Sequence, residues 1–340
     1  MSSRRRAIAI ALGLLLVSCA RHRHHAVGRD GAIVDRAPCA IAGDYATWVK
    51  AYGDDLAFEA NKSGLDLELA ETPADVIYPR AEYEALQRAG AAGRCVKLRY
   101  FSDGLRVTGF VVRPKIEPGV RRPAILFARG GNRELGKIDE HVLMDFQRFA
   151  DAGFVVIGTQ YRGVDGGEGK DEFGGADVDD VLALVPLARA LPDVDGDNLF
   201  LLGGSRGGME ELLAIKRKIP VNAAAARSPA LDLQEVGRQR PEMREVFSAL
   251  IPGFADHEVE ELRKRSPMAW PEAIDVPFLF FQARQDWRVP FGDATRFDVL
   301  LRAHDKPHEL VVYERDGHGL WFHREDVLAR TIAWFRRFQR

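Results

Sequence analysis

Short nonpolar segments alternate with amphipathic segments from about residue 94 onward, and this alternation limits the fold more than any other feature. Runs rich in nonpolar residues span 124–128, 154–160, 198–203, 221–226, 277–283 and 309–314. Such runs are typical of strands that are covered on both faces of a parallel sheet. Helical spacing of nonpolar residues occurs between them, at 138–152, 177–191, 206–217, 291–303 and 325–338. The sequence therefore predicts an α/β fold in which helices cover both faces of a mostly parallel sheet.

Three further regions complete the predicted organisation of the chain. Residues 95–101 and 105–112 are β-rich runs on either side of Asp103-Gly104, a pattern that indicates a hairpin. Residues 43–93 have mainly helical spacing and are predicted to form a helical N-terminal extension. Residues 231–268 are rich in Glu, Arg and Leu between two predicted strands, so they are predicted to form a helical insertion that acts as a lid. The catalytic domain is expected to span 94–340.

The start of the chain has the pattern of a secretory signal. Three arginines from Arg4 to Arg6 precede a nonpolar run over 7–17, which is shorter than the roughly 20 residues that a membrane-spanning helix needs. The stretch Leu16-Val17-Ser18-Cys19 resembles the lipobox of bacterial lipoproteins. That resemblance implies a signal peptide at 1–18 and a lipid on the Cys19 thiol, followed by a tether at 19–42. The alternative is a plain secretion signal with an incidental cysteine.

The expected location is therefore the cell envelope, outside the cytoplasm and anchored to a membrane. Cys39 and Cys95 either form a disulfide, as such a location permits, or remain two buried thiols. The 48 Lys and Arg residues nearly balance the 50 Asp and Glu residues, which argues against a nucleic-acid partner. Neither a cluster of metal-ligating residues nor a dinucleotide-binding motif is recognisable, so we expect no metal and no cofactor.

The motif with the clearest chemistry is Gly203-Gly204-Ser205-Arg206-Gly207, which follows a predicted strand and precedes a predicted helix. Gly-x-Ser-x-Gly in this context is typical of the nucleophile elbow of α/β-hydrolases, in which a sharp turn exposes the serine hydroxyl. The backbone N–H of Arg206 is then placed to stabilise an oxyanion. The alternative is a glycine-rich turn with a purely structural role.

A serine nucleophile needs a base and a carboxylate, which follow it in the order Asp, then His, in this fold. His318 lies in the glycine-flanked loop after the last predicted strand, whereas His323 begins a helix. Asp286 follows the strand at 277–283, and its main rival, Asp316, is close enough to His318 to shape the same turn. We therefore predict a triad of Ser205, Asp286 and His318.

These motifs resemble those of the prolyl oligopeptidase family of serine peptidases. The resemblance rests on Gln160-Tyr161-Arg162-Gly163, the elbow around Ser205, Asp286-Trp287-Arg288-Val289-Pro290 and Asp316-Gly317-His318-Gly319. It implies an α/β-hydrolase fold and the same three triad residues.

Two features of the sequence depart from the family pattern. Peptidases of the family often carry a tyrosine before a glycine pair as an oxyanion donor, but Arg129 stands at that place, before Gly130 and Gly131. The second donor is then a backbone N–H of Gly130 or Gly131, or the Arg129 guanidinium, unless Arg129 is a structural ion-pair residue. The segment before the hairpin is also too short for the β-propeller of many family members.

The predicted reaction is acyl transfer through an acyl-enzyme, with small peptides as the expected substrate. A carboxylesterase that acts on small or lipid-like esters is the alternative, because the same triad serves both reactions. A protein of another class, a binding protein that keeps the fold but not the activity, is the third hypothesis. The oligomeric state does not follow from the sequence.

Overall fold

The computed structural model describes residues 28–41, 43–65, 73–115 and 117–340. The predicted signal at 1–18, Cys19 and the first part of the tether lie outside these residues. Within the described ranges, the strands form one nine-stranded sheet. In their order across the sheet they are β1 (Ile33–Pro38), β2 (Cys95–Ser102), β3 (Leu105–Val112), β5 (Val155–Thr159), β4 (Arg122–Ala128), β6 (Val194–Gly204), β7 (Ala223–Arg227), β8 (Phe278–Ala283) and β9 (His308–Tyr313).

The pairing of these strands confirms the predicted fold class. From β5 across β4, β6, β7 and β8 to β9 every neighbouring pair is parallel. β1, β2 and β3 extend this sheet at one side with antiparallel pairing. β2 and β3 form the predicted hairpin, and Asp103 and Gly104 at its turn both have positive φ, 48° and 74°.

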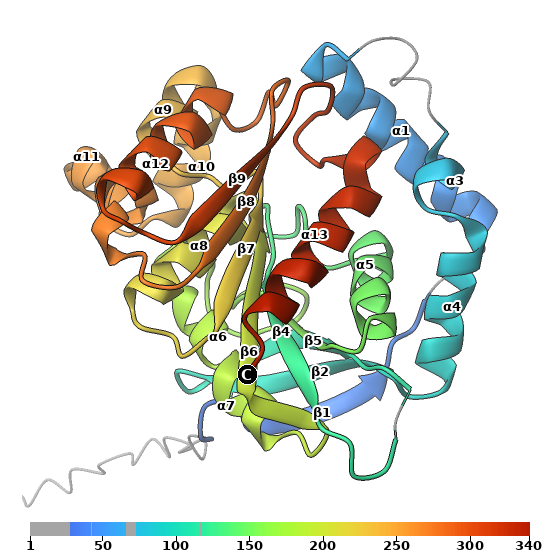
Figure 1. Cartoon of the computed structure of the whole chain (residues 1–340). Coiled ribbons are helices and arrows are strands. Elements are labelled where there is room, and N and C mark those ends of the chain that lie inside the picture. The colour runs from blue at the N-terminus through green and yellow to red at the C-terminus, as the bar shows by residue number, and fades with distance from the viewer. Residues whose placement is uncertain (1–27, 42, 66–72, 116) are drawn as a thin grey trace, which may run out of the picture.

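Helices cover both faces of the sheet (Figure 1). One face carries α6 (Val178–Leu182), α7 (Leu184–Ala190), α8 (Arg206–Lys216), α9 (Leu233–Gln239), α10 (Glu242–Leu250), α11 (Phe254–Arg265) and α12 (Phe291–Ala303). The other carries α1 (Tyr45–Ser63), α3 (Ala74–Ile77), α4 (Arg80–Ala91), α5 (Glu140–Asp151) and α13 (Arg324–Arg337). Short 3₁₀ segments lie at Pro267–Ala269, Pro271–Ala273 and Trp321–His323. None of the helices in the described ranges is both long and nonpolar enough to cross a membrane.

The structure divides the predicted helix at 177–191 into α6 and α7, which meet at Ala183. Pro186 explains the division, because its ring has no N–H to donate and clashes with the carbonyl four residues earlier. The insertion at 231–268 is helical, as expected. Its three helices, α9, α10 and α11, contribute buried residues to the same hydrophobic core as α8.

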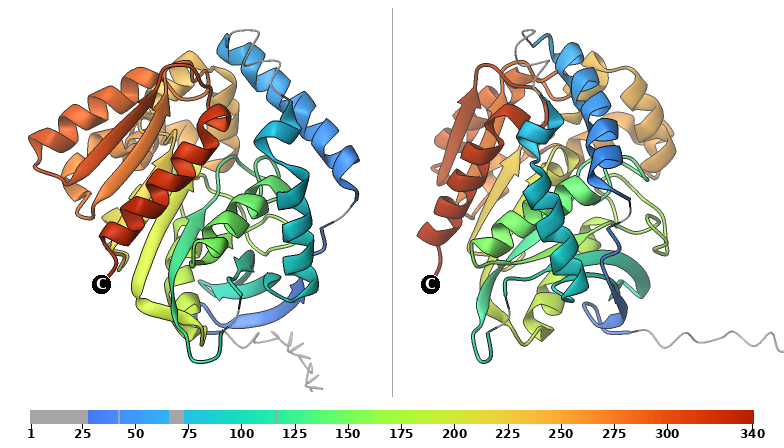
Figure 2. Two further views of the ribbon diagram at one scale, coloured as in Figure 1. Left: turned by 45° about the vertical axis from the view of Figure 1, so that its right-hand side comes forward. Right: turned by 90° about the vertical axis from the view of Figure 1, so that its right-hand side faces the viewer.

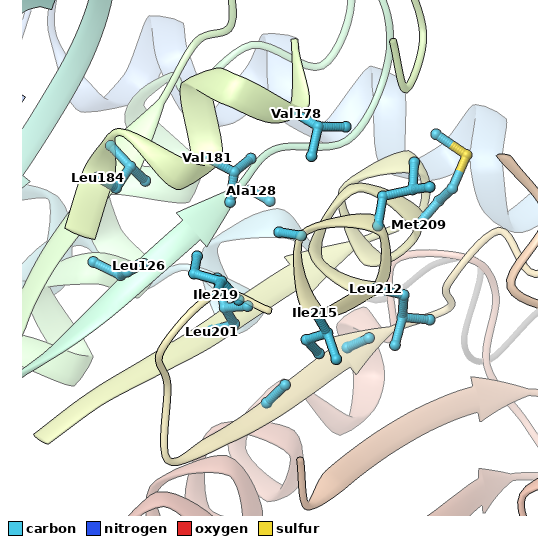
Figure 3. Packing of buried hydrophobic residues seen from close by; sticks show 14 of the residues in the cluster. Leu126, Ala128, Val178, Val181, Leu184, Leu201, Met209, Leu212, Ile215 and Ile219 are labelled. Carbon is cyan, nitrogen blue, oxygen red and sulfur yellow. The ribbon is translucent and has the colours of Figure 1, made fainter. Parts of the chain in front are cut away.

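The buried strands separate two hydrophobic cores. In β6, Leu201 belongs to one core, whereas Phe200 and Leu202 belong to the other, because successive side chains of a strand point to opposite faces. Figure 3 shows the core under α8, where Met209, Leu212 and Ile215 of the helix lie over strand residues such as Leu126 and Leu201. This packing fixes α8, and with it the turn that precedes the helix, against the sheet.

The structure corrects the prediction that residues 19–42 form a tether. Residues Ile33–Pro38 form the edge strand β1, which pairs with β2, and all six residues are exposed. Because neither face of β1 is buried, its sequence has no pattern of alternating burial by which it could be recognised. A disulfide joins Cys39, just after β1, to Cys95 at the start of β2, with the Cα atoms 5.3 Å apart. Of the two alternatives for these cysteines, a disulfide or two buried thiols, the structure shows the disulfide.

The N-terminal helical extension packs onto the same body as the sheet, as both views in Figure 2 show. Trp48 and Tyr52 of α1 stack on each other, with ring centroids 5.3 Å apart. Arg324 of α13 binds the extension through the carbonyl of Ile77 and the carboxylate of Glu82, at 3.1 and 2.8 Å. The extension is therefore held to the C-terminal helix by buried polar contacts as well as by nonpolar packing.

Candidate active site

Ser205 occupies a sharp turn between β6 and α8. Its φ and ψ are 55° and −124°, a region that non-glycine residues rarely adopt, and functional sites are where such strain concentrates. The glycines around it are required by close packing, since a Cβ on Gly207 would lie 2.0 Å from the carbonyl oxygen of Ala128. This is the local geometry of a nucleophile elbow.

Asp286 and His318 come together at the carboxyl edge of the sheet. His318 Nδ1 lies 2.9 Å from Asp286 Oδ2. Three further donors hold the carboxylate: the backbone N–H groups of Arg288 and Val289, at 2.8 and 2.9 Å, and the Gln282 side-chain amide, at 2.9 Å. The Asp286 side chain is thus fixed in position on the Nδ1 side of the imidazole.

Asp316, the rival carboxylate, makes different contacts. Its Oδ2 accepts hydrogen bonds from the backbone N–H of His323 and pairs with His323 Nδ1 at 2.9 Å, and its Oδ1 binds the N–H of Gly317. Asp316 therefore shapes the loop that carries His318, and Asp286 is the carboxylate at the imidazole of His318.

Strand β7 connects the serine turn to the histidine loop. The backbone N–H of Ser205 donates to the carbonyl of Arg227 at 2.8 Å. The neighbouring Ser228 donates its hydroxyl to the carbonyl of His318, also at 2.8 Å. Two adjacent residues at the end of β7 therefore hold the backbones of both Ser205 and His318.

Backbone donors lie next to Ser205. A Cβ on Gly130 would be only 3.4 Å from the Cβ of Ser205, which places the backbone of Gly130 beside the serine side chain. Among the backbone hydrogen bonds of the described residues, none uses the N–H groups of Gly130, Gly131 or Arg206. The N–H groups of Gly130 and Arg206, the two residues next to Ser205 in space and in sequence, therefore have no backbone acceptor within these residues.

The Arg129 side chain is engaged elsewhere, which corrects both roles considered for it. Its guanidinium donates to the backbone carbonyls of Gln160, Gly130, Leu135 and Arg133, at 2.7 to 3.1 Å. Burial, together with the nearby charge of Arg206, lowers the pKa of Arg129 to about 10. Arg129 is thus neither an ion-pair residue within the described chain nor a free oxyanion donor, but a support for the loop at 130–135.

Sequence reasoning missed a buried cluster of charges behind the serine. The Arg206 guanidinium binds Asp171 at 2.8 Å, Glu210 at 2.9 Å and also Asp177, and it donates to the carbonyl of Gly131 at 3.2 Å. Burial, reinforced by the charge of Asp177, raises the pKa of Glu210 well above its usual range. The cluster links the first turn of α8 to the loop of Gly131. Asp171 and Asp177 lie 35 and 29 residues before Arg206, so their pairing with it has no local signal. Only the four-residue spacing of Arg206 and Glu210 on one helix could have indicated a pair.

Glu211, the next residue of α8, is fully buried, and neither carboxylate oxygen has a hydrogen-bond partner within the described chain. Burial raises the pKa of Glu211 well above its usual range. The folded protein therefore keeps the Glu211 proton to a higher pH than the unfolded chain, which releases it above a pH of about 4.3. Stability is lost as the pH rises above that value, up to the pKa of the folded state.

We predict that Glu211→Met raises the free energy of unfolding at pH 8 by about 1–4 kcal/mol, because it replaces an unpaired buried acid with a nonpolar side chain of similar volume. Urea unfolding at pH 5 and pH 8 measures this gain, which should be smaller at pH 5. Glu211→Gln is the matched control for titration alone. A Glu211→Met protein less stable than the wild type at pH 8 would contradict the prediction.

Comparison with known proteins agrees with this geometry. A family model described as "Prolyl oligopeptidase family" matches residues 141–339. The uncharacterized peptidase YtmA of Bacillus subtilis is 30% identical over 226 residues, which cover 66% of this chain and 86% of YtmA. Dipeptidyl-peptidase 5 of Porphyromonas gingivalis is 24% identical, over 65% of this chain but only 35% of its own length.

Solved structures with lower identity share the fold. Acylaminoacyl peptidase of Pyrococcus horikoshii matches 72% of this chain and 41% of its own, with a TM-score of 0.61 and 20% identity. Acetyl xylan esterase 1 of a Thermoanaerobacterium species matches 71% of this chain and 83% of its own, with a TM-score of 0.53 and 17% identity. The family model covers more than half of the chain, and YtmA is matched over most of its length. The protein therefore belongs to the prolyl oligopeptidase family of serine peptidases, with an α/β-hydrolase fold.

Proposed function

We propose that this enzyme cleaves short peptides by acyl transfer, with Ser205 as nucleophile, His318 as general base and acid, and Asp286 as the orienting carboxylate. The observation that carries the proposal is the 2.9 Å contact of His318 Nδ1 with Asp286, at the same sheet edge as a serine in the strained elbow conformation. A proton held on Nδ1 by the carboxylate leaves the lone pair of Nε2 free to act as a base.

The reaction follows from these roles. Nε2 of His318 takes the proton of the Ser205 hydroxyl as Oγ bonds to the carbonyl carbon of the substrate. The imidazolium then gives this proton to the leaving amine as the carbon–nitrogen bond breaks, and an acyl-enzyme remains on Ser205. Water attacks the acyl-enzyme with His318 again as base, which releases the acid and restores the serine. Asp286 stabilises the imidazolium in both steps.

The oxyanion of each tetrahedral intermediate is proposed to bind two backbone amides. The N–H of Arg206, at the start of α8, is one donor, and the N–H of Gly130 or Gly131 is the other. The assignment is supported by the position of Gly130 and Arg206 next to Ser205 and by the lack of a backbone acceptor for the N–H groups of Arg206, Gly130 and Gly131 within the described residues. One such donor typically contributes about 10²–10³-fold to the rate.

A short substrate is supported by what surrounds Trp287, the residue after Asp286. Arg240, at the end of α9, lies over the indole with its guanidinium carbon 5.0 Å from the ring centroid. Nζ of Lys62, in α1, is 5.9 Å from the same ring. The insertion and the N-terminal extension thus both reach the residue that follows Asp286, and this crowding beside the triad favours a small peptide.

The substrate class is tested with short peptide p-nitroanilides, p-nitrophenyl esters of matching acyl groups, and casein. We expect turnover of peptides and esters and little or none of casein, a long and largely unfolded chain, because Lys62 of α1 and Arg240 of the insertion both crowd the loop that follows Asp286. Turnover of esters alone would contradict the peptidase hypothesis and favour a carboxylesterase. An inert protein with no reactive serine would indicate a binding protein that keeps only the fold.

We further propose that the enzyme works outside the cytoplasm, anchored to a membrane through a lipid on Cys19. The Cys39–Cys95 disulfide supports the location, since disulfides persist mainly in oxidising compartments. Membrane fractionation of a Cys19→Ser variant tests the anchor. The variant should appear in the soluble fraction, and an unchanged membrane association would contradict the proposal.

A further inference from the structure

The carboxyl end of α1 lies against the loop that carries Asp286. Glu59, only 7% exposed, accepts hydrogen bonds from Trp287 Nε1 at 2.9 Å and Arg288 Nε at 3.0 Å. The carbonyl of Gly64, which caps α1, accepts a hydrogen bond from the Gln285 side chain at 3.0 Å. The residues before and after Asp286 are therefore held by a helix more than 220 residues earlier in the chain.

The same end of α1 also touches the loop that carries His318. A Cβ on Gly317 would lie 2.6 Å from the hydroxyl oxygen of Ser63, so the backbone beside His318 packs directly on the helix. Ser63 Oγ is buried and has no hydrogen-bond partner within the described chain. α1 thus contacts both loops whose separation sets the bond between Asp286 and His318.

Glu59 is connected to the carboxylate of Asp286 through the backbone of the loop at 286–289. Asp286 Oδ1 accepts hydrogen bonds from the N–H groups of Arg288 and Val289, which belong to the same short loop as the side chains of Trp287 and Arg288. Glu59 anchors two of those side chains, the Trp287 indole and the Arg288 guanidinium. Although burial opposes it, the hydrogen bond and charge of Arg288, with smaller contributions from Trp287 and His318, lower the pKa of Glu59. Glu59 therefore stays ionised near neutral pH and faces a cation.

On these grounds we infer that Glu59 is a positioning residue of the active site, and that α1 serves as the clamp that fixes the Asp286 loop against the His318 loop. This inference rests on the proposed triad. It assigns the N-terminal extension a part in catalysis, in addition to its packing on the sheet. Glu59 does not touch the reacting atoms, and it acts through Trp287, Arg288 and the backbone of the loop.

The test compares Glu59→Gln with two control variants in α1. Asp55→Asn makes the same change of carboxylate to amide at an exposed position of the helix. Tyr45→Phe removes the hydrogen bond from Tyr45 to the carbonyl of Tyr78, which loosens the other end of α1. Titration with a fluorophosphonate gives the concentration of reactive sites, so that rates are expressed per folded site.

Two acetate esters distinguish two causes of lower activity, a displaced His318 imidazole and a loss of folded protein. Acylation by ethyl acetate needs His318 to protonate a poor leaving group, whereas p-nitrophenolate leaves without a proton. For Glu59→Gln we expect kcat/KM per site to fall between about 10- and 100-fold with ethyl acetate, because small displacements of catalytic groups have effects of that size. With p-nitrophenyl acetate the fall should be several-fold at most. Asp55→Asn and Tyr45→Phe should leave both values, and their ratio, unchanged.

The outcomes distinguish this inference from the proposed function. If the wild type is active and Glu59→Gln keeps the same kcat/KM per site with both esters, or loses both equally, α1 is only a structural support and the inference is wrong. If Glu59→Gln does not fold, Trp287→Phe, which removes one of the two donors to Glu59, provides the same comparison. If the wild type neither reacts with fluorophosphonate nor turns over either ester, the proposed function itself is wrong.

Discussion

Replacement of Ser205 by alanine is expected to lower kcat for peptide and ester substrates by about 10⁴- to 10⁶-fold. The variant keeps the elbow, because the turn is held by backbone contacts: the N–H of Ser205 to the carbonyl of Arg227, and the carbonyl of Ser205 to the N–H of Ala230. Alanine at φ 55° is no more strained than serine. The midpoint of thermal unfolding should therefore change little, and the loss should be one of chemistry alone. Steady-state kinetics and a thermal melt of the same preparation measure the two effects.

Ser228 provides the matched control for this substitution. It also lies at the end of a central strand, is buried, and donates its hydroxyl to the carbonyl of His318. Because that hydroxyl is already engaged, Ser228→Ala should reduce kcat far less than Ser205→Ala. A Ser205→Ala protein that retained most of its turnover would remove Ser205 from the mechanism, and a larger loss with Ser228→Ala would point to a different nucleophile.

Asp286→Asn is expected to reduce kcat by about 10⁴-fold at neutral pH. The asparagine side chain fits the same space, but it has one acceptor oxygen where aspartate has two. Four donors converge on Asp286: His318 Nδ1, the Gln282 amide, and the N–H groups of Arg288 and Val289. An amide nitrogen must then face one of them. If it faces Nδ1, the imidazole is driven to the tautomer with its proton on Nε2, which cannot accept the proton of Ser205.

Asp316→Asn tests whether this effect is specific. Asp316 is buried, and it lies only two residues before His318 in the sequence. Its carboxylate, however, binds Gly317 and His323. We expect it to affect stability more than kcat, with a kcat loss far below that of Asp286→Asn. The reverse order of losses would assign the orienting role to Asp316 and would require a His318 loop different from the one described here.

Much of the sheet and the candidate triad could be predicted from the sequence because their signals are local. Strands such as β4 and β8 are buried on both faces, so their nonpolar composition marks them directly. The elbow is recognisable because glycines must stand on either side of Ser205 for the turn to pack. Asp286 and His318 are recognisable because each follows a predicted strand, which brings them to one edge of the sheet.

The contacts that could not be predicted join residues far apart in the chain. β1 is exposed on both faces, so it carries no hydrophobic pattern. Arg129 stands where the family pattern predicts an oxyanion donor, yet its guanidinium is taken up by four backbone carbonyls of the surrounding loops. The pairing of Glu59 with Arg288 joins residues 229 positions apart, and the sequence alone does not distinguish a buried glutamate in a helix from a solvent-exposed one. These contacts follow from how the extension packs, which depends on the tertiary structure.

The central claim is that Ser205 is a nucleophile activated by His318 and Asp286. The most direct test treats the wild-type protein and the Ser205→Ala variant with a fluorophosphonate and maps the modified residue by mass spectrometry of its peptides. We predict one adduct per wild-type molecule, on Ser205, and none on the variant. An unmodified wild-type protein, or an adduct on any other residue, would contradict the account.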